Sequence, residues 1–106
     1  MEAVIYSFIV KPNHEEEFIQ SWTELTQLFY KHAGSRGSRL HKESENIFIE
    51  YAQWPDIETY ERASEKMPIF SKNISTRMRN ACEQIETLHQ ISEVKDLIKS
   101  EAFTPK

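Results

Sequence analysis

The stretch FIEYAQWPDIETY, residues 48–60, has the pattern of a strand that stops abruptly and is followed at once by a helix. The β-branched and aromatic residues before Pro55 are typical of a strand. Pro55 lacks a backbone donor and ends strand pairing, and Asp56 can cap a helix that starts at Ile57. Trp54 and Tyr60 therefore stand on either side of one corner, where they either pack as core or line a small-molecule pocket.

Further strands and helices are expected on both sides of this corner. The only glycines, Gly34 and Gly37, break an amphipathic helix that Asn13 can cap, and they precede a hairpin with the turn ESEN, residues 43–46. The expected elements are a strand (3–11), a helix (14–33), two strands (38–42 and 47–54), two helices (57–66 and 68–83) and a strand (85–94). This β-α-β-β-α-β order predicts a ferredoxin-like α+β fold, an antiparallel sheet with helices on one face.

The length and the charge of the chain limit the possible classes of protein. The 106 residues suit one domain, residues 1–94, with a C-terminal tail over residues 95–106. With 13 Lys and Arg against 17 Asp and Glu, the net charge is -4, which argues against nucleic acid or an anionic membrane as partner. One cysteine, no long apolar run and an acidic start of the chain predict a cytoplasmic protein.

The first strand points to a homodimer. It is apolar on both faces: Val4, Tyr6, Phe8 and Val10 on one, Ile5 and Ile9 on the other. The chain has helices for one face only, so a second copy of the same sheet is expected to cover the other, in a two-fold dimer. Leu97, Ile98 and Phe103 of the tail are expected to pack on the partner subunit.

The hairpin suggests a ligand pocket on one sheet face. If ESEN closes it symmetrically, Arg39 lies opposite Glu50 and His41 opposite Phe48. Alternation then predicts one face with Arg39, His41, Phe48, Glu50, Ala52 and Trp54, and another with Leu40, Ile47, Ile49 and Tyr51. Polar groups within an apolar wall are typical of a ligand pocket.

Simpler interpretations stand beside this one. Arg39 and Glu50 can be an ordinary cross-strand ion pair, and His41 a structural histidine. Trp54 can be core, and Trp22, on the helical stripe, fits the core better than a pocket. The other histidines, His14, His32 and His89, have no metal-ligand spacing to each other or to Cys82, so no metal site is expected.

The stretch GSRGSRLHKESENIFIEYAQWPDIETYERAS, residues 34–64, resembles the antibiotic biosynthesis monooxygenase family of dimeric α+β barrels. In that family a glycine-containing turn leads to a strand ending in Leu-His and then to a strand ending in Tyr-x-x-Trp. Within it, YAQW followed by Tyr60 is most similar to the quinone-forming monooxygenase of actinorhodin biosynthesis. The resemblance implies oxidation of a phenolic substrate by O2 without metal, haem or flavin, in which the ionised substrate supplies the electron.

The resemblance also implies roles for single residues. By motif position His41, Trp54 and Tyr60 correspond to pocket residues of that relative and are the expected catalytic residues. The expected substrate-binding residues are Arg39, Glu50, Phe48 and Trp22. Glu50 stands where that relative has an asparagine, and its carboxylate would disfavour a nearby phenolate unless Arg39 neutralises it. Arg77 or Arg79 corresponds to a pocket arginine. The asparagine, tryptophan and histidine of the haem-degrading branch are absent from their positions, so haem is not an expected substrate.

Two hypotheses for function follow. The first is a cofactor-independent monooxygenase that oxidises a small aromatic or quinol-type compound with O2. The alternative is a non-catalytic small-molecule-binding or sensing module on the same barrel, with Arg39 and Glu50 merely paired.

Overall fold

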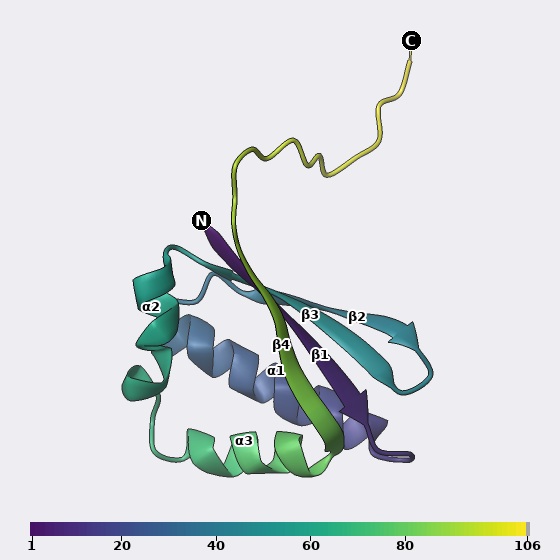
Figure 1. The fold of residues 1–106 in the computed structure, drawn as a ribbon, viewed down its shortest axis with the longest axis vertical. Helices are drawn as coiled ribbons and strands as arrows, with labels where there is room; N and C mark the ends of the chain where they lie inside the picture. Colours follow the sequence, from purple (N-terminus) through teal and green to yellow (C-terminus); the bar gives the residue numbers. More distant parts are fainter. Residues whose placement is uncertain (106) are drawn as a thin grey trace.

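The computed structural model describes residues 1–105, which form one four-stranded sheet with a layer of helices (Figure 1). The elements are β1 (Glu2–Val10), α1 (Glu15–His32), β2 (Ser38–Ser44), β3 (Ile47–Trp54), α2 (Ile57–Glu61), the 3₁₀ helix η1 (Ala63–Lys66), α3 (Ser71–Asn80) and β4 (Cys82–Ser92). No helix within the described residues is both long and apolar enough to cross a membrane.

The sheet has the strand order β2-β3-β1-β4, and all neighbouring strands are antiparallel. This arrangement confirms the predicted ferredoxin-like α+β fold. Because β1 and β3 occupy the centre of the sheet, side chains from these two strands form most of the surface on which the helices pack.

The core between sheet and helices divides into two clusters. In the first, the fully buried ring of Phe18 on α1 lies between Phe8 and Phe48, with ring centroids 4.9 and 5.2 Å away. The second is built around Trp54 at the end of β3. Tyr6 packs against both clusters, so the middle of β1 links the two halves of the core.

The turn between β2 and β3 is tighter than expected. It contains only Glu45 and Asn46, whereas the prediction used all four residues of ESEN. A bulge then falls between Lys42 and Ser44, so one residue of β2 has no partner in β3. Together the short turn and the bulge move the register by one residue from the symmetric pairing.

This shift corrects the predicted faces of the hairpin. The observed pairs are Ser38–Ala52, Arg39–Tyr51, Leu40–Glu50 and His41–Ile49. The predicted pairs of Arg39 with Glu50 and of His41 with Phe48 are wrong. Since side chains alternate along a strand, Arg39 and His41 lie on the sheet face away from the helices, and both are exposed.

Some predicted helix limits also need correction. Asn13 has a positive φ of 67° and does not cap α1, which has no side-chain cap. The helix expected over residues 57–66 is divided into α2 and η1, because the chain turns to bury Ala63 against the second cluster. The helix expected over residues 68–83 is only α3, and β4 already begins at Cys82.

The sheet face opposite the helices is largely apolar along β1 and β3, beside the exposed Arg39 and His41 of β2. It carries Ile5, Ile9, Ile47, Ile49 and Tyr51, all only half-buried. β4 is exposed at every residue except Cys82, and residues 93–105, without helix or strand, run away from the domain (Figure 1). The apolar sheet face and the tail are the surfaces that are expected to contact a second copy of the chain. The dimer itself stays a prediction.

The two glycines offer a matched test of the loop before β2. Gly34 and Gly37 have φ of 80° and 92°, and a Cβ at Gly34 would lie 2.8 Å from Cγ2 of Thr59, whereas at Gly37 it would meet open space. Gly37→Ala is expected to cost about 1–2 kcal/mol for its left-handed backbone alone. Gly34→Ala should cost clearly more, because the side chain of Thr59 on α2 must also move. Equal losses in thermal unfolding would contradict this.

Candidate functional site

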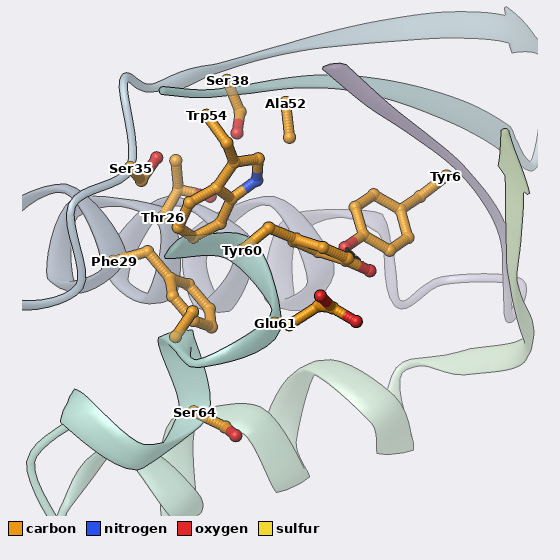
Figure 2. A pocket seen from close by; sticks show the side chains of 11 residues that line it. Tyr6, Thr26, Phe29, Ser35, Ser38, Ala52, Trp54, Tyr60, Glu61 and Ser64 are labelled. Atoms are coloured by element: carbon orange, nitrogen blue, oxygen red, sulfur yellow. Dashed lines mark hydrogen bonds between the residues drawn. The ribbon is translucent and has the colours of Figure 1, made fainter. Parts of the chain in front are cut away.

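A cavity of about 310 Å³ lies between the sheet and the helices at the Trp54 end of β3 (Figure 2). Its wall combines aromatic rings with small hydroxyl-bearing side chains. The lining residues are Tyr6, Thr26, Phe29, Ser35, Ser38, Ala52, Trp54, Tyr60, Glu61, Ala63 and Ser64. Volume and lining fit the lower end of the range for small-molecule pockets.

The corner after β3 brings Trp54 and Tyr60 into the same cavity. Asp56 accepts a hydrogen bond from the backbone N–H of Thr59 at 2.7 Å, which confirms it as the cap of α2. The rings of Trp54 and Tyr60 meet edge to face with centroids 5.5 Å apart, and Phe29 meets Trp54 in the same way at 6.0 Å. Three aromatic rings thus form one continuous wall.

Two tyrosine hydroxyls meet within the cavity. The hydroxyl of Tyr6 donates to that of Tyr60 over 3.2 Å, a long distance for this kind of hydrogen bond. Burial raises the pKa of Tyr6 far above its ordinary range, and the hydrogen bond to Tyr60 adds to the rise. Tyr6 is therefore a neutral donor at physiological pH and not a proton acceptor.

Glu50 lies on the helix-facing side of β3, as predicted, but it is not part of the cavity wall. The residue is only 9% exposed, and burial raises the pKa of its carboxyl group. The Trp22 indole and the Ser38 hydroxyl lie near enough to offset part of that rise. Ser38 lines the cavity, so Glu50 stands directly behind the wall.

Two buried indole N–H groups have no hydrogen-bond partner among the described residues, Nε1 of Trp22 and Nε1 of Trp54. Trp22 therefore approaches the Glu50 carboxylate without forming a full hydrogen bond to it. Trp54 is only 5% exposed, and Figure 2 shows the nitrogen-bearing edge of its ring on the cavity side. An unsatisfied buried donor is uncommon in proteins and needs an explanation.

The structure brings together only some of the predicted site residues. Trp54 and Tyr60 line the cavity, whereas Phe48 and Trp22 belong to the first core cluster. Arg39 and His41 lie on the opposite sheet face. The register shift thus removes both Arg39 and His41 from the site.

Neither candidate arginine enters the cavity. Arg77 on α3 forms ion pairs with Glu17 and Glu24 of α1, each over 2.9 Å, and so ties the two helices together. Arg79 is exposed. No lining residue of the cavity is Lys, Arg or His, and no cluster of metal-ligating side chains occurs within residues 1–105.

Sequence reasoning missed several cavity residues. Tyr6 alternates with Val4 and Phe8 on the helix-facing side of β1. Tyr6 lies opposite Glu50 in the β1–β3 pairing, so a prediction of that pairing would have located it near the site. Phe29 lies on the apolar stripe of α1, and such a stripe by itself does not distinguish a core residue from a cavity wall. For Glu61, one residue after Tyr60, no local pattern distinguishes a cavity residue from a solvated one.

The raised pKa of Glu50 predicts a pH-dependent stability. Between the ordinary carboxyl value of 4.5 and the higher folded-state pKa, the unfolded chain loses this proton while the folded chain keeps it. Glu50 therefore contributes less to stability as pH rises through that window. Glu50→Gln is expected to melt at a higher temperature than the wild type at neutral pH, and the gain should vanish below about pH 4.5.

Thermal melts from pH 4 to 8 measure this difference, with exposed Glu43→Gln on β2 as control. A Glu50→Gln variant with the same or a lower melting temperature at neutral pH would mean that the folded protein stabilises the ionised carboxylate.

No protein-family model matches the sequence, and no curated protein does. The structure of SnoaB, a cofactor-independent oxygenase from Streptomyces nogalater, aligns with 92% of this chain and with 97% of its own chain, with 17% identity and a TM-score of 0.75. An antibiotic biosynthesis monooxygenase matches 90% of this chain over 100% of its own, with 14% identity and a TM-score of 0.71. The structure of an uncharacterised NIPSNAP domain protein from Burkholderia xenovorans aligns with 93% of this chain and with 100% of its own chain, with 12% identity and a TM-score of 0.70.

At these identities the likeness establishes the fold, which proteins of more than one kind share. The closer similarity to the quinone-forming enzyme of actinorhodin biosynthesis stays a prediction. The fold itself is the one found in solved antibiotic biosynthesis monooxygenases, in agreement with the resemblance of residues 34–64.

Proposed function

We propose that the cavity binds a small aromatic phenol or quinol and that the protein oxidises it with O2 as a cofactor-independent monooxygenase. The observation that carries this proposal is the continuous cavity wall of Phe29, Trp54 and Tyr60, in which the buried indole N–H of Trp54 has no partner among the described residues. A flat ligand would stack on the rings, and an oxygen acceptor on it would satisfy this donor once the side chains that cover the nitrogen move aside. The fold shared with a cofactor-independent oxygenase supports the reaction class.

The reaction class has a simple balance. A ring C–H ortho or para to a phenolic hydroxyl, or the equivalent CH2 group of the keto tautomer as in an anthrone, is converted to C=O; one O2 is consumed, and the second oxygen atom leaves as water with the two hydrogens removed from the substrate. The substrate is the reductant, so the protein only has to hold it beside O2, exclude bulk water and take up a proton. Among the residues that the structure describes, Glu61 alone brings a carboxylate to the cavity wall, and we assign it as the acceptor of the substrate proton.

One observation favours the alternative of a non-catalytic binding module. The cavity wall has no cationic side chain, since Arg39 and His41 lie on the other sheet face. An ionised phenol would therefore lack a partner of opposite charge, which makes it harder to form.

Oxygen uptake with a panel of hydroquinones and anthrones separates the two functions. The monooxygenase should consume one O2 for each anthrone oxidised, and heat-denatured protein controls for autoxidation. Binding under nitrogen, followed by tryptophan fluorescence, without O2 consumption in air across the panel would favour the binding module.

Tyr60→Phe tests the hydroxyl pair. The variant keeps the ring against Trp54 and removes one partner of a long, partly buried hydrogen bond, so it should cost about 0.5–1.5 kcal/mol of stability. Ligand affinity or turnover should fall, because the Tyr60 hydroxyl accepts from Tyr6 and keeps its own proton for a ligand, and the variant loses this donor. Chemical denaturation and ligand titration measure the two effects. A stability loss without any change in binding would assign Tyr60 to packing alone.

A further inference from the structure

A second cavity, of about 370 Å³, adjoins the first, and Phe29 and Ser64 line both. We call it the helix groove. It is bounded by Leu25 and Phe29 of α1, by Met67 and Ile69 of the segment before α3, and by Ser75 of α3. Two of its sides are therefore apolar, and the third, on α3, carries the hydroxyl groups of Ser71 and Ser75 and the long side chain of Lys72.

Phe29 and Ser64 form the boundary between the two cavities, and Phe29 is the bulky one of the pair. Phe29 is half-buried and meets Trp54 edge to face at 6.0 Å, so it belongs to the wall of the first cavity as much as to that of the groove. Ser64, the other shared residue, is small and exposed. A ligand that lies against Trp54 can thus extend past Phe29 without displacing a bulky side chain at Ser64.

The rim of the groove exposes large apolar side chains. Ile69 is 85% exposed and Phe70, its neighbour, is 57% exposed. Neighbouring exposed apolar residues at the edge of a hollow often mark a binding site. A protein partner would need a contact surface of about 800 Å² per side, whereas the groove is a narrow hollow that continues an existing cavity.

We propose that the helix groove is a second ligand subsite, which takes an aliphatic arm attached to the aromatic group in the first cavity. This inference rests on the proposed function, because the arm is located by the ring that precedes it. The substrate class is thereby narrowed to phenols or quinols that carry an alkyl or acyl chain. Each CH2 of the arm buried in the groove is expected to raise affinity by up to about fourfold.

The test uses 1,4-naphthohydroquinone and its 2-alkyl derivatives from methyl to hexyl, titrated under nitrogen and followed by tryptophan fluorescence. In the wild type, affinity should rise with chain length and then level off when the groove is full. Ser75→Phe fills the groove from α3 and should abolish this gain while leaving the affinity of the unsubstituted compound within about twofold. Ile69→Ser, at an exposed position that cannot disturb the core, should weaken only the longer derivatives.

The outcomes distinguish the two proposals. If the unsubstituted compound binds and affinity does not change with chain length, the subsite is overturned while the proposed function stands. A chain-length gain that persists in Ser75→Phe also overturns it, since the arm then lies elsewhere. If neither the unsubstituted compound nor any derivative binds, the proposed function is wrong and the subsite with it.

Discussion

Trp54→Ala is expected to lower the free energy of unfolding by about 3–5 kcal/mol, a large part of the roughly 5–15 kcal/mol available to a domain of this size. The side chain is almost completely buried and packs against Phe29 and Tyr60, so its removal leaves an open hollow that the helices cannot fill. Urea denaturation followed by circular dichroism measures the loss. Half-buried Trp22→Ala is the control and should lose less.

The milder variant Trp54→Phe separates binding from stability. It keeps an aromatic ring but removes the unpartnered N–H, and ligand affinity is expected to fall about tenfold, which corresponds to one lost hydrogen bond. Trp22→Phe removes the other unpartnered N–H, which belongs to the first core cluster, and should leave the affinity nearly unchanged. If Trp54→Phe lowers the ligand affinity no more than Trp22→Phe does, the N–H of Trp54 does not contact the ligand.

Sedimentation at micromolar concentration is expected to give twice the chain mass of 12.6 kDa. The apolar sheet face with Ile5, Ile49 and Tyr51 has no helix packed on it, and a monomer would expose this face to water. A second copy of the sheet would cover it in a two-fold arrangement. A clean monomer at this concentration would contradict the dimer and the barrel.

Ile49→Glu locates the interface. A carboxylate at the centre of the covered face would lose its water without gaining a partner, so the dimer should dissociate about a hundredfold more easily. Tyr30→Glu is the matched control, because it introduces the same charge at an apolar side chain that is 68% exposed on α1. If both variants stay equally dimeric, the interface lies elsewhere. Truncation after residue 94 then tests whether the tail takes part.

The sequence by itself determined those parts of the fold that depend on neighbours along the chain. The alternation in Ile47–Trp54, the apolar stripe of α1 and the Asp56 cap are local signals, and the structure contains all three. The order of elements then limited the topology to the ferredoxin-like sheet, because few arrangements connect such elements without crossings. The meeting of Trp54 and Tyr60 followed from the same corner.

Only the tertiary structure decided which side chains share the cavity. A single bulge before Ser44 shifted the register by one residue, and since side chains alternate with a period of two, it moved Arg39 and His41 to the opposite face. Tyr6 and Phe29 reach the cavity through the pairing of β1 with β3 and the packing of α1. Such contacts join residues far apart in the chain, and their geometry depends on packing that no local pattern records.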